Sequence, residues 1–335
     1  MFAALFLALL ATSPSFQFGK FLRVDLRARV HAEVHEENHF GFERARLGVE
    51  GKFLKHFQYE VERDFRSKHP WKDAFVDVEY FEKAQVQIGK FKIPFSMEQL
   101  TSIANLEFVN RARAAQDLAP ARDIGVMVHG RLFDKAVGYQ AGVFRNDGEN
   151  SESKSGMRGT RTYAARLTVK PLRKVEVGGA VTSSDVPEGL NGLRGENFPH
   201  VYVLGQRLRL GTEFRWEPGP FSFRSEWVHV SEAREGQSVR ETDLPAKISR
   251  SWYASGAWRI SQPIQIAARY ERIRFGSADA SGPAFNSPRA PNLLGNTEQI
   301  WTAGVNWFVH RFAKVQVNGI RDRGWGGAIR FQFSM

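Results

Sequence analysis

Apolar and polar side chains alternate along this sequence with a period of two residues. The clearest stretch runs from Leu22 to Val34, where even positions are apolar and odd positions carry a charged side chain or a histidine. That period places the two kinds of side chain on opposite faces of a β-strand. Strands of soluble proteins usually have about 5 to 6 residues, whereas about 9 to 11 cross a bilayer with tilt, and this stretch is long enough to do so. A slip of one residue would turn its charges toward lipid, at about 2 to 4 kcal/mol for a Lys or Arg near the midplane.

The same alternation returns in about 16 segments, the last of which runs from Gly327 to Met335. Connections after even-numbered segments are short, such as Glu217 to Pro220, and those after odd-numbered segments are mostly long and polar, such as Asn146 to Arg161. Short turns at one end and long loops at the other are typical of outer-membrane barrels. The pattern therefore predicts an all-β fold, a 16-stranded antiparallel transmembrane β-barrel over residues 18–335, located in a bacterial outer membrane.

One connection, from Phe91 to Asp123, is too long and too polar to be a hairpin turn. Connections longer than about 12 to 15 residues are usually functional or disordered. This one leaves the fifth predicted strand and contains apolar residues that can anchor it: Leu100, Ile103, Leu106, Phe108 and Val109. We expect residues 96–123 to fold back into the bore as a constriction loop, the third loop on the long side.

Residues 1–15 contain an apolar run followed by small residues, which is typical of a secretory signal peptide, although no Lys or Arg precedes the run. A buried N-terminal helix is the alternative. The chain has no cysteine, which excludes a disulfide framework and thiolate metal sites. Its net charge of +11 favours anionic partners. Because a barrel is predicted, we expect small inorganic anions and outer-membrane lipid as partners, and no nucleic acid.

Arginine suits an anion path because its guanidinium stays charged and binds oxyanions in a fork geometry. Strand parity and closeness to the constriction loop select the following candidate pore-lining and anion-binding residues: Arg23, Arg27, Arg29, Arg44, Arg46, Lys90, Arg111, Arg113, Arg122, Arg166, Arg209 and Arg224. The alternative for each is an ion pair across strands that merely solvates the wall, because acidic residues such as Glu60 and Glu62 share the same parity. Clustering of these acids on the third and fourth strands would give the bore one acidic and one basic wall.

The segment from His35 to His39 spells H-E-x-x-H, a pattern that binds zinc when a helix places both histidines on one face. Here it follows a long alternating strand without helical periodicity. Residues four apart in an extended chain lie about 13 Å apart, too far to share a zinc ion. We therefore expect no metal site and no cofactor, and no catalytic nucleophile motif is recognisable.

Several pieces of the chain resemble the phosphate- and polyphosphate-selective porins of the O and P type. The most specific is IGKFKIPFSMEQLTS (Ile88 to Ser102), and others are FERARLGVEG (Phe42 to Gly51), GYQAGVFRNDG (Gly138 to Gly148) and EPGPFSFRSEWVHV (Glu217 to Val230). The resemblance covers most of the chain in order. It implies a trimer of 16-stranded barrels that passes anions through arginine-lined pores. The C-terminal residue is Met335, where such barrels usually have Phe.

The sequence therefore predicts a non-enzymatic porin for passive diffusion of small anions, phosphate or polyphosphate above all. A general diffusion porin with weak selectivity is the first alternative. A membrane-embedded hydrolase would need a Ser or Asp beside a His at the outer rim of the barrel. A barrel that serves as a surface scaffold would have a plugged lumen.

Overall fold

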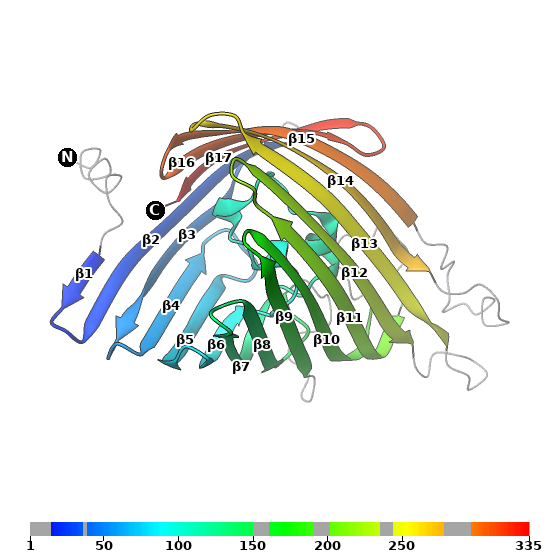
Figure 1. Cartoon of the computed structure of the whole chain (residues 1–335). Helices are drawn as coiled ribbons and strands as arrows, with labels where there is room; N and C mark the ends of the chain where they lie inside the picture. The colour runs from blue at the N-terminus through cyan, green and yellow to red at the C-terminus, as the bar shows by residue number, and fades with distance from the viewer. Residues whose placement is uncertain are drawn as a thin grey trace.

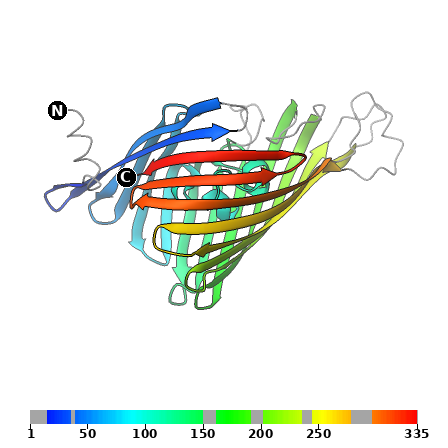
Figure 2. The same ribbon diagram turned by 90° about the horizontal axis from the view of Figure 1, so that it is seen from above.

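The computed structural model describes residues 15–35, 39–149, 161–190, 202–234, 244–277 and 296–334. Its strands form one sheet in which each strand from β2 to β17 pairs antiparallel with the next, and β17 pairs with β2. The sheet is thus a closed barrel of 16 strands, as predicted. Figure 1 shows the strands in chain order around the barrel, and Figure 2 shows the red β17 beside the blue β2, where the barrel closes.

The strands of the barrel are long. They are β2 (Leu22–His35), β3 (His39–Phe53), β4 (Phe57–Asp64), β5 (Trp71–Phe81), β6 (Ala84–Lys92), β7 (Arg122–Leu132), β8 (Val137–Phe144), β9 (Thr162–Leu172), β10 (Val175–Leu190), β11 (Tyr202–Trp216), β12 (Phe221–Arg234), β13 (Leu244–Arg259), β14 (Ile264–Ser277), β15 (Asn296–His310), β16 (Ala313–Arg321) and β17 (Trp325–Ser334). Three short helices, α2 (Met97–Leu100), η1 (Ile103–Asn105) and η2 (Ala114–Leu118), lie between β6 and β7. Every predicted alternating segment is a strand, and several strands extend further than the alternation indicated.

A short additional strand, β1 (Ser15–Phe18), was not predicted. It pairs with β2 from Ser15↔Asp25 to Phe18↔Leu22. β17 pairs with β2 farther along, from Ala328↔His35 to Ser334↔Arg29, while the other edge of β2 is taken by β3. β1 therefore prolongs the closing seam beyond the end of β17. Residues 1–14, the rest of the predicted signal peptide, lie outside the described residues.

The outer face of the barrel is apolar. Outward side chains such as Leu47, Ile88 and Trp301 are half exposed or more. Near the short turns, aromatic rings stack across strands, as in Trp216 with Phe223 at 5.3 Å between centroids. Aromatic side chains at the ends of an apolar band are typical of membrane barrels. No helix in the described part of the chain is long and apolar enough to cross a membrane.

The connections at one end of the barrel, here called the short-turn end, are 54–56, 82–83, 133–136, 173–174, 217–220, 260–263 and 311–312. The opposite end, the long-loop end, includes the connection between β6 and β7. Of the H-E-x-x-H segment, residues 36–38 lie outside the described residues. His35 and His39 are backbone partners in the β2–β3 ladder, so both histidines belong to strands. Among the described residues, no group of three or more His, Cys, Asp or Glu is placed to hold a metal ion.

Candidate functional site

The connection between β6 and β7 folds into the barrel, where Figure 1 shows it in cyan. We call residues Ile93–Ala121 the inner segment. One cluster of its buried apolar side chains packs against the barrel wall. Phe95, Ala112, Ala114, Leu118 and Ala119 of the segment contact Val228, Val230, Tyr253, Ile273 and Phe275 of the wall. Those wall residues are apolar at inward positions of β12, β13 and β14, where a fully water-filled bore would have polar ones. The wall is therefore built to receive the inner segment.

A glycine on β11 makes room for this packing. A Cβ atom on Gly211 would lie 3.0 Å from Cζ of Phe95, closer than side chains normally approach. Phe95 is completely buried there. Of the anchors predicted from the sequence, Leu106, Phe108 and Val109 are buried as well.

Hydrogen bonds join the inner segment to the wall on both sides of these contacts. Backbone N–H groups of Glu98, Val109 and Arg113 donate to side chains on β12, β16 and β14, at 2.7, 2.7 and 2.6 Å. In the other direction, Nζ of Lys314 donates to the carbonyl oxygens of Ala104 and Leu106 at 2.9 and 2.8 Å. Buried backbone groups need such partners. The inner segment is therefore held in one position across the bore.

Two cavities lie beside the inner segment. The larger, of about 370 Å³, contains Glu43 and Ser67 and lies toward the long-loop end, so we call it the long-loop cavity. The second, of about 270 Å³, contains Arg27 and Glu60 and is called the short-turn cavity. The residues that line both are Arg46, Lys92, Ile103, Arg111 and Arg122. Four basic side chains therefore lie at the boundary that the two cavities share.

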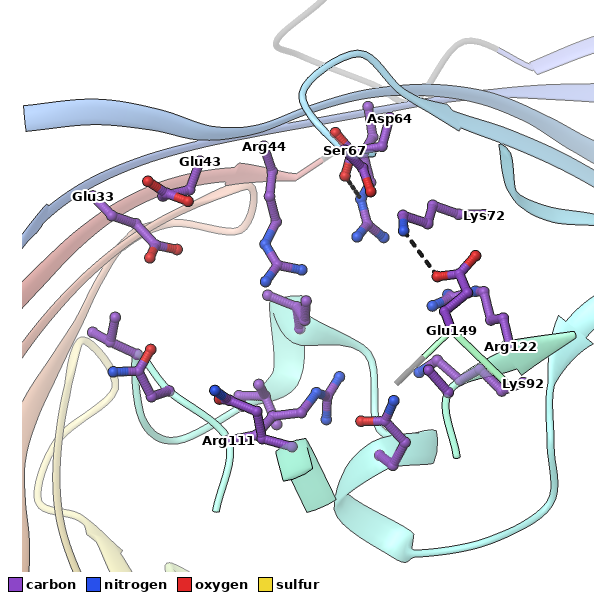
Figure 3. A pocket seen from close by; sticks show the side chains of 18 of the residues that line it. Glu33, Glu43, Arg44, Asp64, Ser67, Lys72, Lys92, Arg111, Arg122 and Glu149 are labelled. Carbon is purple, nitrogen blue, oxygen red and sulfur yellow. Dashed lines mark hydrogen bonds and ion pairs between the residues drawn. The ribbon is translucent and has the colours of Figure 1, made fainter. Parts of the chain in front are cut away.

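Basic side chains outnumber acidic ones in both cavities. Seven basic and four acidic residues line the long-loop cavity, and six basic and two acidic residues line the short-turn cavity. Figure 3 shows Arg44 reaching from the wall toward the inner segment, and Lys72, Lys92, Arg122 and Glu149 grouped on another side of the long-loop cavity. A unit anion at contact with one cation gains about 1 to 4 kcal/mol, depending on how watery the surroundings are.

Within the described residues, two of the predicted arginines form no ion pair with a carboxylate. The side chain of Arg44 forms no hydrogen bond or ion pair with the residues that the structure describes, and its Nε is buried. The guanidinium of Arg111 donates to the carbonyl oxygens of Glu98 and of Thr101, the latter at 2.7 Å. Burial lowers the pKa of Arg111 to about 10, so it stays charged at neutral pH. These two residues offer positive charge that is not taken up by an ion pair within the described chain.

The other ten predicted residues bind carboxylates. They are Arg23, Arg27, Arg29, Arg46, Lys90, Arg113, Arg122, Arg166, Arg209 and Arg224. Arg122 makes the best-defined pair, with Nε 3.0 Å and Nη2 2.7 Å from the two oxygens of Asp73. The expectation of separate acidic and basic walls is wrong, because Glu60 and Glu62 of β4 bind Arg27 and Arg29 of β2 directly.

The structure brings six of the predicted residues to the two cavities: Arg27, Arg29, Arg44, Arg46, Arg111 and Arg122. Lys90 reaches the long-loop cavity through Glu149, at 2.7 Å. Arg23, Arg113, Arg166 and Arg224 line neither cavity. Arg209 is only 1% exposed and donates to Asp147 and to the carbonyl oxygen of Leu118, so it supports the inner segment and does not face the pore.

Three cations at the cavities were not predicted. Lys92 follows Lys90 at the same parity on β6 and donates to the carbonyl oxygens of Leu100 and Thr101 at 2.9 and 3.1 Å. Arg330 occupies an inward position of the last strand, between the outward Ile329 and Phe331, so alternation already implied its orientation. Lys72 precedes Ala74, where the alternation of its strand begins in the sequence, and no sequence signal placed it.

A closed barrel with an apolar exterior and a charged bore crossed by an inner segment defines a class, the porins of outer membranes. The family model described as phosphate-selective porin O and P matches residues 20–323. The chain belongs to this family and is an outer-membrane channel protein.

Solved porin structures share the fold. OmpT, an outer membrane protein of Vibrio cholerae, is similar at a TM-score of 0.67 and 10% identity, over 95% of this chain and 99% of that chain. OmpF of Salmonella typhi, in complex with daunomycin, gives 0.66 and 9% over 96% and 100%. The anion-selective porin from Comamonas acidovorans gives 0.60 and 11% over 93% and 99%. No curated protein matches the chain.

Proposed function

We propose that this protein is a passive channel for small oxyanions, of which phosphate is the foremost, and that it catalyses no reaction. The observation that carries the proposal is the set of four basic residues that line both cavities, Arg46, Lys92, Arg111 and Arg122. In the proposed channel they form the walls of the passage from one cavity to the other. Lys92 and Arg111 donate to backbone carbonyl oxygens there, and Arg111 keeps its positive charge for an anion. The description of the family as phosphate-selective supports the same substrate class.

The chain would act as a homotrimer in the bacterial outer membrane after removal of its signal peptide. A trimer form is described for OmpT of Vibrio cholerae, a fold relative. The apolar outer face supplies the surface for lipid contact and for contact between barrels. The mass of the purified protein–detergent complex, from light scattering combined with refractive index, tests the trimer.

The reversal potential of single channels across a tenfold gradient of potassium chloride, and then of potassium phosphate, tests the function. We expect anion-selective potentials in both salts and saturation of the phosphate current at a lower concentration than the chloride current, because bound oxyanions occupy the passage. A potential at zero or of cation-selective sign rejects the proposal.

A general diffusion porin with weak selectivity is the second candidate. It is favoured by the ion pairs that neutralise ten of the twelve predicted residues, as with Arg46 between Glu62 and Asp64 at 2.9 Å each. Such a channel would show phosphate and chloride currents that rise linearly with concentration. A hydrolase has less support: His129 pairs with Asp77 at 2.9 Å, but in the described chain no hydroxyl group joins this pair.

A further inference from the structure

The connection after β8 also enters the bore, over residues Arg145–Glu149, which we call the second inner segment. Its backbone is bonded to β7 at two points, from Arg145 N to the oxygen of Ile124 at 2.8 Å and from Glu149 N to the oxygen of Arg122 at 3.2 Å. Gly148 has a φ of 85°, and a Cβ atom there would lie 3.0 Å from the nitrogen of Ala121. Only glycine allows this close approach to the end of the inner segment.

Asp147 fastens the second inner segment to strands β10 and β11 of the wall. Its carboxylate accepts from Ser184 Oγ at 2.5 Å and from Arg209 Nη2 at 2.8 Å, and it also binds Arg207. Burial by itself raises the pKa of Asp147, but Arg209 and Arg207 outweigh that effect and hold the pKa below its ordinary range. This anchor holds Glu149, two residues further along the chain, at the long-loop cavity.

The carboxylate of Glu149 lies between two lysines. Its Oε2 is 3.0 Å from Lys72 Nζ and its Oε1 is 2.7 Å from Lys90 Nζ. The side chains of Lys72, Lys90 and Glu149 are 9%, 21% and 12% exposed. The contact with Lys90 is an ion pair without hydrogen-bond alignment, since Oε1 is buried and accepts no hydrogen bond of normal geometry. Figure 3 shows Lys72, Glu149 and Arg122 together at one side of the cavity.

An oxyanion placed between two ammonium groups beside a guanidinium would have the surroundings that Glu149 has. We propose that Lys72 and Lys90 form an anion-binding site of the channel and that Glu149 is its built-in occupant, which a permeating phosphate displaces. Phosphate has four oxygens and can bond both lysines at once. When phosphate leaves, Glu149 returns, so the two partly buried lysines are never left without an anion. The tethered carboxylate therefore weakens binding and speeds release. This inference rests on the proposed function.

The test compares Glu149→Gln with Glu43→Gln, because both remove one negative charge from the long-loop cavity. Glu43 is exposed there and lines the cavity, but no ion pair joins it to Lys72 or Lys90. Single-channel currents are measured in pure potassium phosphate over a range of concentrations. E149Q is expected to lower the half-saturating phosphate concentration by about fivefold or more and to lower the maximal current. E43Q is expected to change the half-saturating concentration by less than about twofold.

A second variant tests the identity of the site. In the E149Q channel, Lys90→Gln should raise the half-saturating concentration again, to within about twofold of the wild type, because one of the two ligands is lost. Equal effects of E149Q and E43Q, or an E149Q gain that survives K90Q, would overturn the proposal. Failure of the proposed function can be distinguished from failure of this inference, because the proposed function is tested by the reversal potential of the wild-type channel alone.

Discussion

The side chain of Arg44 combines a cavity position with the absence of any partner among the described residues. A buried guanidinium nitrogen without a partner calls for an ion or water in its place. We predict that Arg44→Gln raises the half-saturating phosphate concentration about fivefold, the loss of one partly screened charge contact. The control is Arg23→Gln, which removes the same charge from an exposed pair with Asp25 outside both cavities. Equal effects of the two changes would contradict a direct contact at Arg44.

The buried charges around Asp147 have a structural role that pH can reveal. Asp147 and Glu232 share Arg207, and Lys247 lies 3.3 Å from Glu232, so acids and bases alternate in a completely buried chain. Removing one member of a buried pair costs about 3 to 5 kcal/mol, because its partner stays buried and charged. We predict a loss of this size in Asp147→Asn, measured as a lower midpoint temperature of barrel unfolding in detergent.

The pH dependence of that loss follows from the lowered pKa of Asp147. A carboxyl whose pKa is depressed by folding stabilises the folded state fully above its unfolded pKa of about 3.9, and the contribution disappears as pH falls toward the folded value. The difference between wild type and D147N should therefore be constant from pH 8 to about pH 5 and shrink below about pH 4. A difference that is unchanged at pH 3 would exclude a charged role for Asp147.

At the scale of elements, the inner segment depends on a few apolar contacts. Phe95 is fully buried under Gly211, and loss of a buried Phe side chain costs about 3 to 5 kcal/mol. We predict that Phe95→Ala loosens the inner segment, so that chloride conductance and open-channel noise both increase in planar bilayers. Phe331→Ala on the lipid-facing side, where Phe331 is 49% exposed, serves as the control and should leave both unchanged. A quiet F95A channel of wild-type conductance would show that the polar contacts alone hold the segment.

The sequence predicts the strands well because lipid on one side and water on the other impose a period of two on every strand. It also marks the inner segment, through its length and through Leu106, Phe108 and Val109. The sequence does not identify Phe95 as an anchor of the inner segment, or the inward residues Val228 and Val230 as the part of the wall that the segment packs against. Their role depends on which strands face the segment across the bore. The sequence also does not show which arginines lack an ion pair. Arg44 and Arg46 have the same parity, but cross-strand register places Asp64 opposite Arg46 only.

At the scale of the whole molecule, closure of the barrel joins the two ends of the chain. Alternation predicts that the last strand is a wall strand, but β1 is four residues long and too short to show a period. On the inner side of the seam, Arg330 Nε lies 2.6 Å from Glu33 Oε1, and both side chains are buried. Arg330 also donates to the carbonyl oxygen of Val109, so one residue links β2, β17 and the inner segment.

This link leads to a double-mutant prediction. Arg330→Met should destabilise the barrel by about 3 to 5 kcal/mol, because the buried carboxylate of Glu33 loses its arginine. Replacing both residues, Glu33→Met with Arg330→Met, should restore most of that loss, because two apolar side chains leave no buried charge. Arg215→Met is the control, since its pair with Glu176 is partly exposed and worth about 0 to 1 kcal/mol. The stability of each variant is measured by unfolding in detergent with heat or urea. If the double variant is as unstable as Arg330→Met alone, the hydrogen bond to Val109, and not the ion pair, secures the seam.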